Sequence, residues 1–283
     1  MLLYDKLPTS TGFDNSLSNI GKTKTTGLEI CLRTINISTE KFQWVTDFTF
    51  STSKSTIVEL ASGVTQDIGN LWFVGQPIDV QYDVKKIGIW QLNERDAAKP
   101  FKQAPGDLKI LDIDKNDTIN QKDKIILGQK SPKWNADFTN RFTYGWFDLS
   151  FNIYARMGQL INSSAYDFDP RMYDNRMKVD YWTPTNPTND YPRFNKNLAN
   201  IPYSSSLTYV DGSFVKIKYI TLGCTIPKKI FPANSISSVY FYVSIKNPYT
   251  LYQKTINGMD PEQNGSINFP LSRLSLIGLN CTF

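Results

Sequence analysis

The stretch WNADFTNRFTYGWFDLSFNIYARMG, residues 134–158, decides the fold. Apolar and polar residues alternate along 134–144 and again along 147–157, and Gly145-Trp146 separates the two runs. Successive side chains of a strand point to opposite faces, so this pattern predicts an antiparallel hairpin with an apolar face and a polar face. Each strand is about as long as a tilted strand that crosses a bilayer, roughly ten residues. The residues expected on the apolar face include Phe138, Phe142, Phe151 and Ile153.

The same period of two recurs in other parts of the chain. It is clear in 41–53 and in 236–247. It is noisier in 27–37 and in 213–226, and we expect the second of these strands to be bulged. An all-β chain with several such strands is therefore predicted.

The sequence also ends in mid-strand, at RLSLIGLNCTF, residues 273–283. Ile277, Leu279, Cys281 and Phe283 fall on one face of this strand, which we expect to pair with 236–247. A soluble β-sandwich alternates in the same way, so the period alone does not decide whether the apolar face meets a protein core or lipid.

The links between the predicted strands distinguish these two folds, because they alternate strictly between short and long. The short links are expected at 38–40, near Gly75-Gln76-Pro77, at 145–146 and at 227–235. The long links are expected at 54–70, 92–132, 159–212 and 249–271. Such alternation is typical of a transmembrane barrel with short periplasmic turns and long outer loops. We therefore predict an antiparallel transmembrane β-barrel segment of roughly nine or ten strands, with a soluble all-β domain as the alternative.

Composition excludes several classes of function. The chain has 31 Lys and Arg against 26 Asp and Glu, and this net charge of +5 is spread without a basic run, which argues against a nucleic-acid partner. It has no His, so the commonest general base and the commonest transition-metal ligand are missing. The three Cys residues are far apart and predict neither a zinc site nor a disulfide framework. Neither a membrane-spanning helix nor a signal peptide is expected.

Several motifs occur in the order and spacing of a known family. They are FVGQPI (73–78), GIWQ (88–91), PGDLKILDIDKNDTINQKDKIILG (105–128), FDLSF (147–151), YWTPTNPTNDYPR (181–193), DGSFVKIKYITLG (211–223) and RLSLIGLNCTF (273–283). With them the whole of 1–283 resembles the C-terminal barrel region of the SusC/RagA family of TonB-linked outer-membrane proteins. Members of that family carry a signal peptide, a carboxypeptidase-like domain, a TonB-contacting segment and a plug before the barrel. The resemblance covers only the final third, or nine or ten of roughly 22 strands.

The resemblance implies a function in transport at the outer membrane and no enzyme activity. The expected cargo is an oligosaccharide or a peptide, received together with a SusD-like surface lipoprotein, and import would be driven by the TonB complex through regions outside this chain. It also implies that the terminal aromatic Phe283 is an assembly signal. The alternatives are a soluble or surface-attached glycan-binding module and an inactive fragment of the transporter.

The loop DIDKNDTINQKD, residues 112–123, has oxygen ligands at the spacing of a calcium loop. The predicted ligands are the side chains of Asp112, Asp114, Asn116 and Asp123 and the main-chain carbonyl of Thr118. Two features weaken the match, because Asp117 replaces the usual glycine and Asp123 is shorter than the usual Glu. An acidic surface loop whose side chains cap its own turns is the alternative to a Ca²⁺ site.

Aromatic residues on a long outer loop are candidates for cargo binding. Tyr181, Trp182 and Tyr191 lie among prolines, and their rings could stack on a sugar or could pack to stiffen the loop. Four other tryptophans near strand ends are expected to be interfacial girdle residues: Trp44, Trp90, Trp134 and Trp146.

Carboxylates on the predicted polar face are Glu29, Asp47, Asp137 and Asp148. Two facing carboxylates could form a glycosidase pair. Basic residues on the same faces, such as Arg33, Arg141 and Arg156, favour the polar lining of a channel instead.

Overall fold

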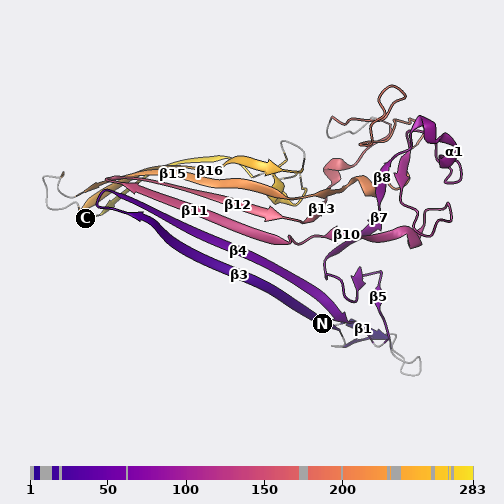
Figure 1. Ribbon diagram of the computed structural model, residues 1–283, viewed down its shortest axis with the longest axis horizontal. Coiled ribbons are helices and arrows are strands. Elements are labelled where there is room, and N and C mark those ends of the chain that lie inside the picture. The colour runs from indigo at the N-terminus through magenta and orange to yellow at the C-terminus, as the bar shows by residue number, and fades with distance from the viewer. Residues whose placement is uncertain are drawn as a thin grey trace.

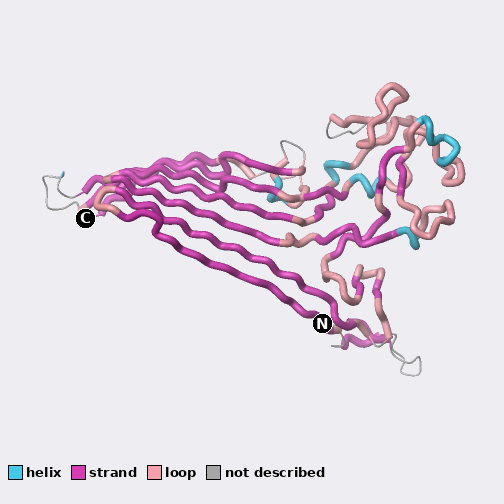
Figure 2. Tube along the Cα trace, in the orientation of Figure 1, coloured by secondary structure: helices cyan, strands magenta, loops and turns pink. Residues whose placement is uncertain are grey.

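The structure is a computed structural model that describes residues 3–6, 15–18, 21–61, 63–171, 178–198, 200–227, 230, 237–255, 259–266, 268 and 271–282. A large curved sheet forms one part, and loops with short strands form a lobe at one end of it (Figure 1). We call the described residues of 60–133 and 158–213 the outer lobe. Figure 2 shows long strands in the sheet, whereas the lobe is mainly loop.

The sheet has seven antiparallel strands in the order β17-β16-β15-β12-β11-β4-β3. Their bounds are β3 Lys22–Ser38, β4 Phe42–Glu59, β11 Trp134–Tyr144, β12 Phe147–Met157, β15 Phe214–Pro227, β16 Ser238–Gln253 and β17 Leu274–Thr282. Strands β3 and β17 are the edges, so the sheet is open. The predicted all-β antiparallel fold is confirmed, and an open sheet of this kind fits a segment of a barrel.

The hairpin over 134–158 forms as predicted. Every residue of β11 pairs with β12, from Trp134 opposite Met157 to Tyr144 opposite Phe147, and Gly145 adopts the positive φ that its tight turn requires. The register also aligns one apolar residue from each of the seven strands in a row across the sheet. This row is Ile37, Trp44, Phe142, Leu149, Leu222, Val243 and Ile277.

The number of crossing strands differs from the prediction, because β4 pairs directly with β11. The expected turn at Gly75-Gln76-Pro77 lies beside the outer end of β4, where the backbone N–H of Ile57 donates to Gln76 at 3.0 Å. The described residues of 60–133 therefore belong to one long outer connection instead of contributing two more barrel strands. The apolar residues of this region misled the prediction because they form a core of their own.

The remaining strand expectations agree with the structure. β15 carries register shifts between Val215 and Lys216 and between Ile217 and Tyr219, which are the expected bulges. β17 pairs with β16, with Thr282 opposite Ser238. Phe283 lies outside the described residues.

The outer lobe has its own hydrophobic core. Its buried residues are Val84, Ile89, Leu108, Ile110, Phe168, Trp182, Ile201 and Leu207. The small elements of the lobe are β5 Gln66–Asp67, β6 Trp72–Phe73, β7 Val80–Val84, β8 Lys86–Ile89, α1 Arg95–Ala98, β9 Leu108–Ile110, β10 Lys124–Gln129, β13 Leu160–Asn162 and β14 Tyr209–Asp211. Trp72 of β6 packs on a separate buried pair, Ile57 and Leu60. β1 Leu3–Lys6 and β2 Asn15–Ser18 pair in a two-stranded sheet of their own. Among the described helices, none is long and apolar enough to cross a membrane.

Candidate functional site

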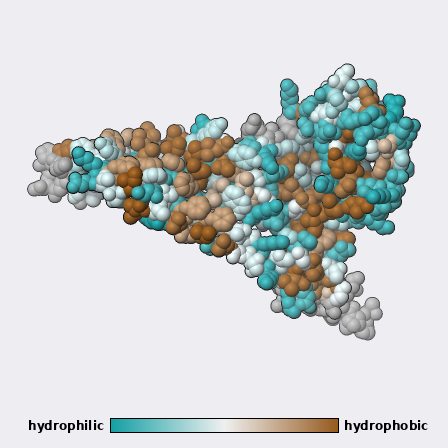
Figure 3. Space-filling model, in the orientation of Figure 1, coloured by the Kyte–Doolittle hydropathy of each residue, from teal (hydrophilic) through white to brown (hydrophobic). Residues whose placement is uncertain are grey.

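One face of the sheet exposes large apolar side chains to the surroundings. Ile277 is 75% exposed and Phe147 is 56% exposed. Leu28, Ile30, Leu32, Phe138, Leu149, Leu222, Phe241, Val243, Ile245 and Leu279 are exposed on the same face. Figure 3 shows such hydrophobic surface over the sheet, while the lobe is mainly hydrophilic. A continuous apolar surface of this extent marks contact with a membrane or a partner.

The opposite face of the sheet carries charged residues that satisfy one another. Asp47 accepts a hydrogen bond from Arg141 and lies 3.7 Å from Nε of Arg33. Asp137 accepts from Asn152 at 2.5 Å, and the hydroxyl of Tyr240 donates to Asp148 at 3.1 Å. The arrangement is that of a polar wall, because each of these carboxylates is held by a basic or neutral donor. Glu29 is exposed, opposite Ser51.

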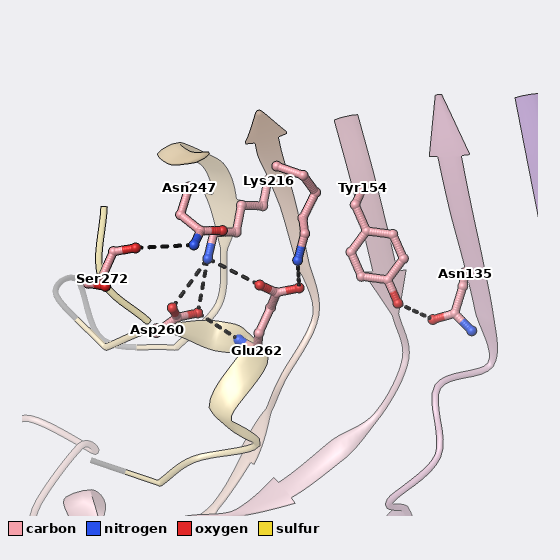
Figure 4. A network of polar contacts seen from close by, with 8 residues as sticks. Asn135, Tyr154, Lys216, Asn247, Asp260, Glu262 and Ser272 are labelled. Carbon is pink, nitrogen blue, oxygen red and sulfur yellow. Dashed lines mark hydrogen bonds and ion pairs between the residues drawn. The ribbon is translucent and has the colours of Figure 1, made fainter. Parts of the chain in front are cut away.

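A buried ion-pair network fixes the last outer connection against this polar face (Figure 4). Lys216 of β15 is 3% exposed, and its Nζ lies 3.2 Å from both Asp260 and Glu262. Lys218 also bonds Glu262, at 2.5 Å. The short helix Pro261–Gln263 holds the two carboxylates side by side, because Asp260 caps it by accepting from the Glu262 N–H. Sequence reasoning missed this cluster, although Lys216 and Lys218 stand two residues apart on one face of β15.

The aromatic residues expected on the outer loop mostly belong to the core of the lobe. Trp182 is 5% exposed, and its indole N–H donates to Gln91 at 2.9 Å. Tyr191 packs on Phe168 with ring centroids 5.5 Å apart, and burial raises the pKa of its hydroxyl. Tyr181 is 36% exposed and packs edge-on against Phe194. These contacts fit the packing interpretation, and burial leaves Trp182 with little surface for a sugar.

The acidic loop brings three of its predicted ligands together. Carboxylate oxygens of Asp112, Asp114 and Asp123 lie within 4.8 Å of one another. Asn116 lies beside them, with its Nδ2 2.8 Å from Asp114. The carbonyl of Thr118 accepts from the Asn120 side chain at 3.0 Å.

The same carboxylates also cap the turns of the loop, as the alternative interpretation expected. Asp112 accepts from the backbone N–H of Lys115 at 2.8 Å and of Asp117 at 2.9 Å. Asp117 takes φ 60°, the left-handed conformation of the glycine that it replaces. Burial opposes ionisation of Asp123, but hydrogen bonds from the N–H groups of Ile113 and Asn120 outweigh it and lower the pKa of this carboxyl.

The expected girdle tryptophans lie at three rim positions and one interior position. Trp134 begins β11 and packs on Phe50, Trp44 stacks on Phe142, and Trp146 lies in the hairpin turn. The prediction is wrong for Trp90, which is 6% exposed within the outer lobe.

Comparison with known proteins shows which family the chain resembles. No family model matches the chain. The TonB-dependent receptor P26 of Formosa agariphila is 28% identical over 316 aligned positions, which cover 100% of this chain and 31% of the relative. The TonB-dependent receptor SusC of Bacteroides thetaiotaomicron is 23% identical over 98% of this chain and 28% of its own length. The chain matches the C-terminal barrel region of the SusC/RagA family. The resemblance predicted from the motifs is confirmed.

Solved structures agree with this family at the level of the fold. The RagAB peptide importer in its open-open state superposes with a TM-score of 0.79 at 18% identity, over 100% of this chain and 31% of that chain. The RagAB peptide transporter gives a TM-score of 0.76 at 19% identity. The chain spans about 30% of the length of the curated relatives it matches. The similarity to TonB-dependent receptors assigns the chain to the outer membrane, as expected, and the named relatives are receptors and not enzymes.

Proposed function

We propose that the chain supplies part of the wall and outer lobe of an outer-membrane, TonB-dependent nutrient importer. The observation that carries the proposal is the sheet with two unlike faces, one exposing large apolar side chains and the other lined by ion pairs. An apolar band facing lipid and a polar interior are what a spanning barrel requires. A soluble binding module would instead bury that apolar face in its own core.

The cargo in this proposal is an oligosaccharide or a peptide, taken up with a surface lipoprotein of the SusD type. Support comes from the relatives, one of which is named SusC, while another solved relative is described as a peptide transporter. The outer lobe presents the polar surface on which cargo and partner would act. Energy would come from the TonB complex through regions beyond this segment of the barrel.

Growth experiments with the intact gene in its host test this function. Deleting the gene should abolish growth on one polymer or peptide class while growth on monomers persists, and the same loss should follow deletion of tonB. Purification in detergent should recover a surface lipoprotein with the receptor. Unchanged growth on every oligosaccharide and peptide tested, or uptake without TonB, would contradict the importer function.

We also propose that the 112–123 loop binds Ca²⁺ with low affinity. Three converging carboxylates offer the hard oxygen ligands that this cation prefers, and a cation between them would offset their mutual repulsion. The residues that would hold it are Asp112, Asp114, Asn116 and Asp123 and the carbonyl of Thr118. The backbone hydrogen bonds that already stabilise the loop leave it ordered without metal, so a bound ion would add stability and not create the fold.

A further inference from the structure

A cavity of about 740 Å³ lies in the outer lobe, away from the acidic loop and from the Lys216 network. It opens between the junction of β7 and β8, the paired strands β13 and β14 and the segment 189–191. Its volume is within the range of pockets that hold small molecules or short peptides, roughly 300–1,000 Å³. Nothing in the function proposed above assigns it a role.

The floor of this cavity is aliphatic. Leu127 of β10, Leu160 of β13 and Val210 of β14 line it, and Leu207 closes one side. The floor can accept a branched or linear hydrocarbon side chain by excluding water from it. Three tyrosines, Tyr166, Tyr191 and Tyr209, also contribute to the lining, so the test below includes a sugar probe.

The wall above the floor carries lysines that exceed the carboxylates available to them. Lys86 is half-buried, and its Nζ donates to the backbone carbonyl of Asp190 at 2.5 Å instead of to a carboxylate. Burial lowers the pKa of this ammonium group, which the nearby Asp190 offsets only in part. Lys85 is exposed beside it and forms no ion pair among the described residues.

Two other charged groups beside the cavity have ion-pair partners. Lys254 on the far rim pairs with Asp211 at 3.0 Å. Asp83, behind the wall, lies 3.4 Å from Lys124. Asn189 is held in place too, because its Oδ1 accepts from the Ile89 N–H at 2.9 Å. Asp190 also lines the cavity, so Lys85 and Lys86 together face one carboxylate and this wall keeps a net positive charge.

We propose that this cavity binds a short acidic peptide, with a carboxylate at Lys85 and Lys86 and a neighbouring aliphatic side chain on the floor. A carboxylate would supply Lys86 with the charged acceptor that it lacks, and charge-assisted hydrogen bonds are roughly twice as strong as neutral ones. The inference rests on the proposed importer function and specifies its cargo. The cavity would be a specificity site on the outer side, selecting anionic over neutral peptides.

The test is calorimetry on the native receptor, purified from its outer membrane in detergent. The probes are an acetylated, amidated Leu-Glu-Leu tripeptide, its neutral Leu-Gln-Leu counterpart and digalacturonate, an acidic sugar. The acidic tripeptide should bind at least about tenfold more tightly than the neutral one. In Lys86→Met the preference should fall to about twofold or less, and Lys85→Met should reduce it in part. Lys99→Met, which removes an exposed lysine paired with Asp96, should keep the full preference.

Equal affinity for the two tripeptides, absence of binding heat from both, or tighter binding of digalacturonate would overturn the proposal. Persistence of the preference in both Lys86→Met and Lys85→Met would also overturn it. If Lys86→Met does not fold, as judged by its heat-modifiable gel mobility, Lys85→Met alone decides, because its side chain is exposed. Binding of the acidic tripeptide without its import by cells would refute the importer function and leave the cavity assignment intact.

Discussion

Two neighbouring residues of β17 provide a matched test of which face of the sheet meets lipid. Ile277 lies in the apolar row opposite Val243, whereas Leu276 faces the polar side opposite Ser244. Both are aliphatic and occupy the same depth, so Ile277→Arg and Leu276→Arg differ only in the face that receives the charge. We expect Ile277→Arg to be strongly destabilising and Leu276→Arg to be mild.

The expected loss of stability in Ile277→Arg follows from the position of Ile277 along its strand. It lies five residues before Thr282, which at about 3.3 Å per residue is roughly 16 Å. With a strand tilt of about 40° this becomes roughly 12 Å, near the middle of an apolar band about 25 Å tall. An arginine there costs about 2–4 kcal/mol, which lowers the folding equilibrium constant roughly 30- to 1,000-fold. At Leu276 the guanidinium stays in the polar interior, and we expect a cost of about 1 kcal/mol or less.

The assay is guanidinium unfolding of each purified receptor variant in lipid vesicles, together with the yield of heat-modifiable receptor in the outer membrane. Ile277→Arg should lower the midpoint and the yield well below those of Leu276→Arg. Equal losses in the two variants, or a larger loss for Leu276→Arg, would refute the assignment of the apolar face to lipid.

Three further predictions concern the loops. Lys216→Met should lower the stability of the last outer connection by about 3–5 kcal/mol, because Asp260 loses its cation, whereas Lys218→Met, at a partly exposed position, should lower it much less. Hydrogen exchange over 259–266 measures this difference, and equal protection in both variants would contradict it. Calorimetry should detect heat when Ca²⁺ binds to the native loop and no heat with Asp112→Asn. Asp117→Asn should bind Ca²⁺ normally, because asparagine tolerates the positive φ at that position. Loss of binding in Asp117→Asn alone would argue against the assigned ligands. Because the fold lowers the pKa of Asp123, the contribution of this carboxylate to loop stability should be complete above its unfolded-state pKa of about 4 and should fade as the pH falls through its folded-state pKa. Amide exchange at Ile113 and Asn120 should then accelerate. In Asp123→Asn the exchange at these two amides should be pH-independent after correction for intrinsic rates.

The sheet was predictable from the sequence because every second residue of its strands faces the apolar side and must itself be apolar. The row from Trp44 through Phe142 and Leu149 to Val243 is readable as alternation, since a slip of one residue would turn each polar neighbour to the apolar side. The hairpin at Gly145-Trp146 was readable for the same reason, together with the glycine that its turn requires.

The outer lobe was not readable in the same way. Residues 71–91 look like strands by composition, but Ile89 and Val84 pack into a core built with Leu108 and Trp182, far away in sequence. Alternation cannot tell such a core from a lipid-facing strand, because both remove apolar side chains from water. The prediction of extended strands there was therefore locally correct, but their apolar side chains were assigned to lipid although they pack in a protein core.

The candidate sites also differ in how far apart their residues lie in the sequence. The acidic loop was readable because its ligands are close in sequence, and its three carboxylates do converge. Lys216 and its partners Asp260 and Glu262 are more than forty residues apart, and only the pairing of β15 with β16 brings them together. The cavity beside Lys86 likewise depends on segments that only the fold assembles.

Spin-label accessibility along β11 tests the central claim most directly. Single cysteines would replace Asp137, Phe138, Thr139, Arg141 and Phe142 in turn, in a receptor in lipid vesicles whose Cys31, Cys224 and Cys281 have been changed to serine. Labels at Phe138 and Phe142 should collide mainly with oxygen dissolved in lipid, and the other three mainly with a water-soluble nickel chelate. Nickel access at all five positions, or labels at Phe138 and Phe142 that neither reagent reaches, would mean that the apolar face meets water or a protein core and would contradict the membrane-barrel account.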